Sequence, residues 1–325
     1  MSIRSVLIVT DINYDLHAAA VGEELKHLGE RVVYWNPADS LAEAGCFSFG
    51  EPPERDVSFS VDTWFASDFK SVWIRRPSAW PDFSQIVPDY RAIVLEEWKF
   101  FVSGAWDRLQ DSVDRFVSLP MNIRRAEAKT SQLTCAIKLG LNVPRTIVSN
   151  DYDQFRTFYT ELGGNVVAKK LRSHQLIAAD RAALFVTTPI MSIDQIKPDE
   201  LSLCPIIFQR RIDKAADSRV ICLGNQVWAF KIEGSKADPP LDYRADFDQA
   251  NALCHTEYGL PETIKLACIK ICRHFGLHFG AFDFVIDREG RHWFMELNAN
   301  GQWLWLQIAT GVPLAHYFAT YLASG

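Results

Sequence analysis

Apolar positions follow two different periods along the chain, and these predict alternating strands and helices. Near the start, residues 5–10 form a β-branched run typical of a buried strand. A helical pattern follows over 17–28 and stops at Gly29, and residues 31–35 form a second strand pattern. This strand–helix–strand unit predicts an N-terminal α/β domain. The turn after the first strand lacks G-x-G-x-x-G, so a dinucleotide site is not expected there.

The same two periods continue to the C-terminus, without an internal repeat or a low-complexity segment. Residues 45–68 are irregular and weakly patterned, and residues 119–120 mark a linker or boundary. Helical spacing of apolar residues occurs over 90–110, 124–140, 151–162, 263–275 and 313–323, with a partly helical acidic stretch over 193–203. Strand patterns occur over 71–75, 143–149, 165–171, 184–188, 206–210, 218–223, 226–232, 280–286 and 291–298. The aromatic residues of 90–110 lie at helical spacing, which predicts core packing.

Composition and charge narrow the classes of protein. The chain has 325 residues, 48% of them hydrophobic, which is longer than one core usually sustains, so several sub-domains are expected. The formal net charge is −6 and no Lys/Arg-rich tract is present, which disfavours a nucleic-acid partner. No stretch approaches the roughly 20 apolar residues of a membrane span, and the N-terminus lacks signal-peptide features. We therefore expect a cytoplasmic protein with no membrane partner.

The seven cysteines are odd in number and scattered, which predicts reduced thiols. Cys268 and Cys272 lie four residues apart on a predicted helix and so share one face. We expect them to be buried and to pack as small hydrophobic groups, in preference to binding a metal.

The final predicted hairpin carries the strongest chemical signal. Asp283 lies in the apolar run Ala-Phe-Asp-Phe-Val-Ile, and Glu296 and Asn298 lie two apart, on one face of the next strand. A two-residue turn at Glu289-Gly290 places Asp283 opposite Glu296, whereas a bulge at Gly290 shifts the pairing by one. A carboxylate in an apolar strand is costly unless it is paired or metal-bound. Two carboxylates and a carboxamide oxygen suit Mg²⁺, which takes further ligands from water and phosphates.

Two lysines are candidates for contacts with phosphates. Lys129 lies on the helix predicted after Ala126, and Lys169 ends the apolar strand that begins at Asn165. No G-x-x-x-x-G-K-[ST] motif occurs, so a P-loop is excluded.

Several stretches resemble the ATP-grasp superfamily of ligases, and they occur in that superfamily's order over residues 119–325. They are Ala126-Glu-Ala-Lys-Thr-Ser-Gln-Leu133, Val166-Val-Ala-Lys169, Phe208-Gln-Arg-Arg-Ile212, Asp217-Ser-Arg-Val220, Phe282-Asp283-Phe284 and Met295-Glu-Leu-Asn-Ala-Asn-Gly-Gln-Trp303. Four further stretches resemble the microviridin-type ribosomal-peptide maturases, or graspetide synthetases, and extend the resemblance to nearly the whole chain. They are the Thr10-Asp11 start, Trp-Ile-Arg-Arg-Pro77, Leu241-Asp-Tyr-Arg244 and Asn-Gly-Gln-Trp303.

The resemblance implies an α/β (α+β) chain with the ATP-grasp fold and an N-terminal pre-ATP-grasp domain. Its parts would be residues 1–118, a central subdomain 119–205, and a C-terminal subdomain 206–325 that carries the metal hairpin. The resemblance implies ATP contacts from Lys129, Lys169, and the hinge residues Gln209, Arg210 and Ile212. It implies Mg²⁺ ligands Asp283, Glu296 and Asn298, and a catalytic Arg219 that faces an acyl phosphate. The chain departs from some relatives at Gly280-Ala281, where no arginine stands two residues before the metal aspartate.

The reaction implied is ADP-forming macrocyclisation of a precursor peptide. An Asp or Glu side chain of the peptide is activated as an acyl phosphate, and a Ser/Thr hydroxyl or Lys amine attacks it. The resemblance also implies a homodimer, a substrate contact at Arg244, and leader recognition in residues 171–203, where Asp194, Asp199 and Glu200 lie close together. Two alternatives stay open: a ligase that adds an amino acid to a protein or small-molecule carboxylate, and a non-catalytic module that binds a peptide or nucleotide.

Overall fold

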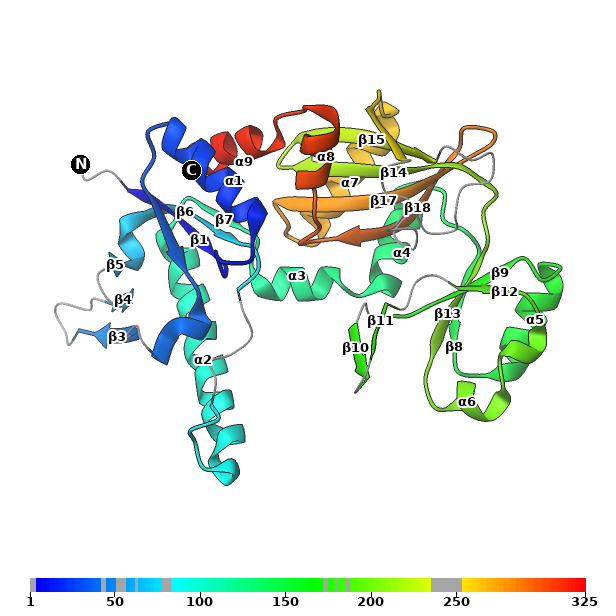
Figure 1. Ribbon diagram of the computed structural model, residues 1–325, viewed down its shortest axis with the longest axis horizontal. Helices are drawn as coiled ribbons and strands as arrows, with labels where there is room; N and C mark the ends of the chain where they lie inside the picture. Colours follow the sequence, from blue (N-terminus) through cyan, green and yellow to red (C-terminus); the bar gives the residue numbers. More distant parts are fainter. Residues whose placement is uncertain are drawn as a thin grey trace. The chain divides into compact units, whose positions relative to one another are not determined.

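The computed structural model describes residues 4–41, 45–50, 57–61, 64–77, 83–171, 175–178, 181–184, 188–234 and 253–325. The chain divides into two compact units (Figure 1). Unit 1 comprises Met1–Ile123, Phe275–Phe279 and Asn300–Gly325, and unit 2 comprises Arg124–His274 and Gly280–Ala299. The division of the sequence at 118/119 and 205/206 stays a prediction.

Unit 1 is built on a parallel sheet with strand order β2-β1-β6-β7. The strands are β1 (Ser5–Val9), β2 (Val32–Trp35), β6 (Phe69–Ile74) and β7 (Arg115–Val117). The helices of this unit are α1 (Leu16–His27), α2 (Pro88–Ser112), α8 (Leu304–Thr310) and α9 (Leu314–Ala323), with 3₁₀ turns η1 (Pro37–Leu41) and η2 (Ala66–Asp68). The strand–helix–strand start predicted from the sequence is therefore confirmed.

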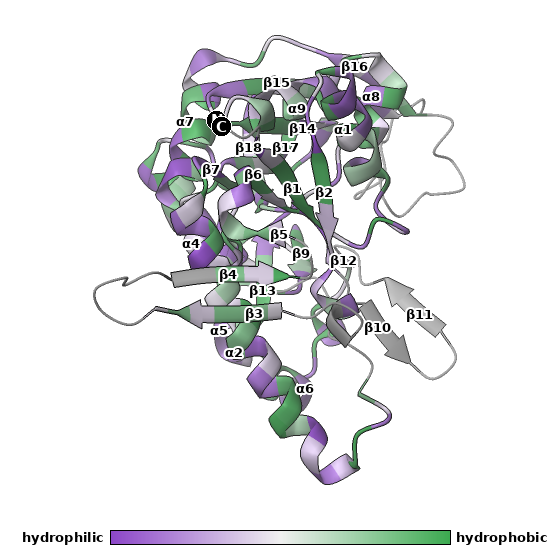
Figure 2. Cartoon of the chain, turned by 90° about the vertical axis from the view of Figure 1, so that its left-hand side faces the viewer, coloured by the Kyte–Doolittle hydropathy of each residue, from purple (hydrophilic) through white to green (hydrophobic). Residues whose placement is uncertain are grey.

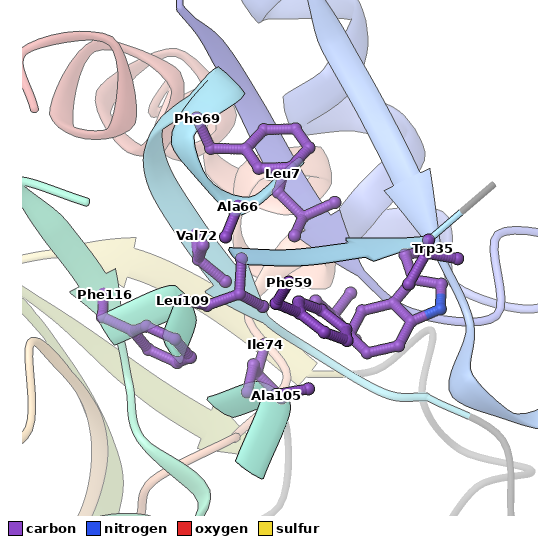
Figure 3. Close-up of a cluster of buried hydrophobic side chains, with 12 residues drawn as sticks. Leu7, Trp35, Phe59, Ala66, Phe69, Val72, Ile74, Ala105, Leu109 and Phe116 are labelled. Atoms are coloured by element: carbon purple, nitrogen blue, oxygen red, sulfur yellow. The ribbon is translucent and has the colours of Figure 1, made fainter. Parts of the chain in front are cut away.

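Alternation along β6 shows how helices cover both faces of this sheet. The Ser71 hydroxyl donates to the Leu322 carbonyl of α9 at 2.8 Å, and the Trp73 ring lies 5.4 Å from that of Phe318 on the same helix. Val72 points to the other face, into a cluster with Leu109 of α2 (Figure 3). Because side chains alternate along a strand, α9 and α2 lie on opposite faces.

Residues 45–68 were expected to be irregular, and that expectation is wrong. They contain the antiparallel strands β3 (Gly45–Phe49), β4 (Val57–Val61) and β5 (Trp64–Phe65). Their aromatic rings pack on the stripe of α2, with Phe47 5.4 Å from Phe101. Only the C-terminal half of α2 supplies fully buried residues, and hydrophobic and hydrophilic residues alternate along the helix (Figure 2). These strands are short, and aromatic contacts with residues distant in the sequence stabilise them. The local pattern of apolar residues therefore did not predict them.

Unit 2 contains two larger sheets and a two-stranded ribbon. The first sheet has the order β12-β9-β13-β8, all antiparallel, with strands β8 (Thr146–Ser149), β9 (Val166–Lys169), β12 (Thr188–Ile190) and β13 (Ile206–Arg210). The second has the order β16-β15-β14-β17-β18, with strands β14 (Lys214–Leu223), β15 (Gln226–Gly234), β16 (Leu253–Glu257), β17 (Phe279–Asp287) and β18 (His292–Asn298). The ribbon pairs β10 (Gln175–Ala178) with β11 (Arg181–Leu184). Figure 1 shows both sheets.

The helices of unit 2 cover these sheets. They are α4 (Lys129–Lys138), α5 (Tyr152–Glu161), α6 (Pro198–Ser202) and α7 (Glu262–His274), with the 3₁₀ turn η3 (Ile193–Gln195). Phe155 and Phe158 of α5 pack in one buried cluster with Val166 and Phe208 of the first sheet. Asp151 caps α5 by accepting from the backbone N–H groups of residues 153 and 154.

Several element boundaries differ from the prediction. The helix expected over 124–140 is two helices, α3 (Pro120–Ala126) in place of the expected linker, and α4. The Gln132 amide explains the break, because it donates to the Ala126 carbonyl at 2.6 Å and so satisfies a group that the helix would otherwise use. Most of the strand expected over 184–188 lies outside the described residues, which here end with β11 at Leu184 and resume with β12 at Thr188. Strands β7, β10, β11 and β16 and helix α8 were not predicted.

The predicted thiol packing is confirmed. All seven cysteines are free, and Cys222, Cys268 and Cys272 are buried together between β14 and α7. Burial raises the pKa of Cys268 well above its usual value, and the hydrogen bond with Cys222 followed by burial does the same for Cys272. Within the described ranges, no helix has the length and apolar character needed to cross a membrane.

Candidate active site

The hairpin of β17 and β18 places Asp283 directly opposite Glu296, the pairing that a two-residue turn was expected to give. The turn is not the two-residue alternative, however. The Asp287 N–H donates to the Arg291 carbonyl at 3.0 Å across a three-residue turn that ends at Gly290, whose φ is +79°. This turn alone shifts the pairing by one residue. A second irregularity next to Asp283 shifts it back, so two register changes cancel before the carboxylates.

Each carboxylate of this pair has a cationic partner. The Arg219 Nη1 of β14 lies 2.6 Å from Asp283 Oδ1, and the Lys129 Nζ of α4 lies 3.1 Å from Glu296 Oε2. The Asn298 amide donates to both carboxylates, at 3.2 Å in each case. The carboxylate side chains are 15% and 14% exposed, so these charges sit in a mostly desolvated place and need their partners.

The donor set fits a hard divalent cation. Across the part of the chain that the structure describes, no group of three His, Cys, Asp or Glu side chains is arranged around a metal position. The candidate set is two carboxylates and the Asn298 carboxamide, held together by the hydrogen bonds from that amide. Rotating the amide presents its oxygen in place of its nitrogen, which completes an all-oxygen set. Mg²⁺ is satisfied by such a small protein set because it keeps waters and binds phosphate oxygens.

The arginine beside Asp283 comes from a neighbouring strand and not from β17 itself. No arginine precedes Asp283 on its own strand, whereas the neighbouring strand β14 supplies one. The Arg219 side chain is 7% exposed, and a guanidinium makes strong, directional hydrogen bonds to carboxylates and phosphates. Only the order of strands in the sheet brings these two residues together.

Lys129 is the first residue of α4, so the break after α3 decides its position. Gln132, one turn later, donates to the Leu297 carbonyl at 2.8 Å and accepts from the Leu297 N–H at 2.9 Å. This two-way pairing attaches α4 to β18 beside Glu296. Gln132 was not among the predicted functional residues, although it lies within the stretch Ala126–Leu133 that resembles the ATP-grasp superfamily.

Lys169 and Gln209 share one face of the first sheet of unit 2. The Lys169 ammonium donates to Gln209 Oε1 at 2.8 Å and lies 3.8 Å from Met295 Sδ. The Gln209 amide in turn donates to Thr146 Oγ1 at 2.9 Å. Met295 directly precedes Glu296. The contact between Lys169 and Met295 therefore places this predicted phosphate lysine beside the hairpin.

The side chain of Arg210 contacts the hairpin. Its guanidinium carbon lies 4.8 Å from the centroid of the Trp293 ring, a cation–π geometry. The Trp293 Nε1 donates to Asp287 at 2.8 Å. Burial on its own raises the pKa of Asp287, but hydrogen bonds from Trp293 and from the Arg291 backbone and side chain lower it to about 2. Ile212 follows β13 in the half-buried connection to β14.

The residues predicted to contact substrate lie elsewhere or outside the described ranges. Asp194 is on η3, and Asp199 and Glu200 are in the first turn of α6; all three are exposed. Arg244 lies outside the residues that the structure describes.

The chain has the ATP-grasp fold of the solved ligases described below, so the predicted fold is confirmed. Neither a family model nor a curated protein matches the chain. Among solved structures, macrocyclase MdnC from Microcystis aeruginosa, bound to precursor peptide MdnA, is 23% identical with a TM-score of 0.82, over 99% of this chain and 100% of that one. A Chryseobacterium gregarium RiPP-associated ATP-grasp ligase, in complex with ADP and a leader and core peptide, is 22% identical with a TM-score of 0.86, over 99% and 96%. D-cycloserine synthetase DcsG is 15% identical with a TM-score of 0.58, over 98% of each chain.

Proposed function

We propose that the chain is an ADP-forming ATP-grasp ligase that closes rings in a ribosomally made precursor peptide. The observation that carries the proposal is the opposed pair Asp283 and Glu296, bridged by Asn298 and flanked by one cation on each side. The likeness in fold to ligases bound to precursor peptides, over 99% of the chain, supports the choice of a peptide substrate.

In this proposal ATP is the phosphoryl donor and the acceptor is an Asp or Glu side chain of the peptide. A carboxylate oxygen attacks the γ-phosphorus, and the bond to the β-phosphate oxygen breaks, giving ADP and an acyl phosphate. A Ser/Thr hydroxyl or Lys amine then attacks the acyl carbon, and inorganic phosphate leaves. Each ring is an ester or an amide, and the peptide loses one water.

The residues of the chain bind and orient the reactants. Asp283, Glu296 and Asn298 would hold Mg²⁺, which neutralises phosphate charge during transfer. Lys129 and Lys169 would bind phosphate oxygens as point charges. The Arg219 guanidinium, already fixed by Asp283, would donate to the oxyanion that develops when the acyl phosphate is attacked. Little covalent work by the protein is needed, because phosphoryl transfer depends on position and electrostatics.

We propose that the exposed carboxylates Asp194, Asp199 and Glu200 contact the leader segment of the peptide. A leader helix with an apolar face and a basic residue would dock there, with the carboxylates fixing its register. Reversal of all three charges should weaken peptide binding at least tenfold and leave ATP affinity unchanged. A matched control reverses three exposed acidic residues elsewhere in unit 2, Asp153, Glu257 and Glu262. Equal peptide affinity of the two triple variants would remove this docking site.

Mass spectrometry tests the reaction. The purified protein is incubated with ATP, Mg²⁺ and the precursor peptide encoded beside its gene, and each ring appears as the loss of one water. A gain in mass from an added amino acid would instead indicate the alternative ligase, whose metal and phosphate residues would be the same. Absence of ADP release with peptide, amino acids and ATP present would contradict both ligase functions.

A further inference from the structure

Three stretches of family resemblance have no role in the chemistry above, yet they meet within unit 1. They are the Thr10-Asp11 start, the Trp-Ile-Arg-Arg-Pro77 stretch and Asn-Gly-Gln-Trp303. Thr10 follows β1 and Arg75 follows β6, and these strands are parallel neighbours, so their carboxyl ends lie at the same edge of the sheet. The segment from Asn300 to Trp303, which follows β18 in the chain, lies at this edge.

Arg75 and Asn300 are joined by two reciprocal hydrogen bonds. The Arg75 Nη1 donates to the Asn300 carbonyl at 2.6 Å, and the Asn300 amide donates to the Arg75 carbonyl at 2.6 Å. Arg75 is 2% exposed, and its Nε lies 3.6 Å from Asp15 Oδ2. Thr10 donates its hydroxyl to the same carboxylate oxygen at 3.0 Å. The main chain at Asn300 is therefore fixed by a buried guanidinium that is itself held in place.

His17 fixes the same segment three residues further on. Its Nε2 accepts hydrogen bonds from the backbone N–H groups of Trp303 at 3.0 Å and Leu304 at 3.1 Å. These groups begin α8, and the side chain of the cap residue Trp303 makes no capping hydrogen bond. The imidazole thus satisfies two N–H groups at a helix start, for which the helix itself has no acceptors. The Trp303 ring packs edge-on against His17 at 5.0 Å and stacks on Phe318 at 4.8 Å.

The charge states of this cluster match its hydrogen bonds. Because Nε2 accepts, His17 is neutral and carries its proton on Nδ1, which lies 3.5 Å from Asp15 Oδ1. Burial lowers the pKa of His17, and the hydrogen bond with Asp15 raises it. The charges of Arg75 and Arg76 lower this pKa further, so the pKa lies below its usual value. Burial alone raises the pKa of Asp15, but the hydrogen bond with His17, the charge of Arg75 and the hydrogen bond from Thr10 lower it to about 2.

We propose that Thr10, Asp15, His17 and Arg75 form an interlock that positions the proposed Mg²⁺ ligands by holding the main chain directly after them. The inference rests on the proposed function. Asn300 is two residues after Asn298 in the sequence, and two residues span at most about 7 Å of chain. Fixing the main chain at Asn300 therefore restricts the positions that Asn298 can take. This restriction matters because Mg²⁺ demands near-ideal octahedral geometry. The three stretches of resemblance therefore act together as a support for the metal site and belong to no separate site.

Two substitutions at His17 test the interlock. His17→Leu removes the acceptor, whereas His17→Gln places an amide oxygen near the Nε2 position and keeps it. The control is His316→Leu, which removes another histidine of unit 1 that pairs with a carboxylate, Glu24 at 3.1 Å. The Mg²⁺ dependence of ADP binding is measured by calorimetry, together with amide hydrogen exchange at Trp303 and Leu304.

We expect His17→Leu to raise the Mg²⁺ concentration for half-maximal ADP binding at least tenfold and to speed exchange at both amides. His17→Gln should stay within about threefold of the wild type, and the control should be unchanged. If His17→Leu fails to fold, Asn300→Ala removes one of the reciprocal bonds and should raise the same Mg²⁺ concentration.

Faster exchange with a wild-type Mg²⁺ dependence would overturn the inference and leave the interlock a purely structural support. A wild-type protein that binds no Mg²⁺–ADP would instead contradict the proposed function itself.

Discussion

The substitution Glu296→Gln separates the metal role of this residue from its role in folding. The change keeps the shape of the side chain. It also keeps an oxygen that can accept the hydrogen bond from the Asn298 amide, which is 3.2 Å long in the unsubstituted protein. It removes the negative charge that faces Lys129 at 3.1 Å and opposes Asp283 across the hairpin. Only the electrostatics at the candidate metal position change.

The expected losses differ in size. A metal supplies several kcal/mol of charge stabilisation in transfer reactions, and each 1.36 kcal/mol is a factor of ten in rate. Loss of about 3–4 kcal/mol therefore lowers ADP production about 10²–10³-fold. The free energy of unfolding should change by only ~1 kcal/mol, because losing the ion pair with Lys129 is offset by relief of repulsion with Asp283.

The assay is ADP release with precursor peptide across a range of Mg²⁺ concentrations, beside urea denaturation of the same samples. Glu289→Gln is the control, since Glu289 lies in the turn of the same hairpin and its side chain is 66% exposed. ADP production by Glu296→Gln within about threefold of the wild type at every Mg²⁺ concentration would refute the metal assignment.

Four further outcomes are expected. Lys169→Ala should raise the KM for ATP about tenfold and lower kcat in steady-state kinetics, because its ammonium acts as a point charge on phosphate. Asp287→Asn should lower the free energy of unfolding by ~2 kcal/mol in urea, because the charge-assisted hydrogen bonds with the turn and Trp293 are weakened. Asp15, with a folded pKa of about 2 against 3.8, stabilises the fold above pH 3.8 by about 2 kcal/mol, which is lost as pH falls towards 2. His17 has a folded pKa below 6.5, so its contribution to stability is fully present above pH 6.5 and is lost as the pH falls. Urea denaturation midpoints of the wild type and of Asp15→Asn, measured from pH 7 to 3, check the direction of both pH dependences.

Local patterns were sufficient for most long elements, because each carries its own signal. The hairpin turn at Gly224-Asn225 and the cap at Asp151 are features of this local kind, since turn and cap chemistry depend only on neighbouring residues. The strands between 45 and 65 were not predicted, because aromatic contacts with α2 stabilise them and the residues in contact are distant in the sequence.

The sequence alone determined the candidate metal residues and placed Glu296 and Asn298 on one strand face, since a period of two sets which side chains of a strand share a face. It did not determine that Asp283 pairs with Glu296, because that register depends on two irregularities that cancel between the turn and Asp283. Only the tertiary structure decided that Arg219 joins Asp283 from a neighbouring strand, that Lys129 begins a helix, and that His17 holds Trp303. These pairings join residues 64 to 286 positions apart, and no local pattern encodes which distant strand ends or helix starts meet when the core closes.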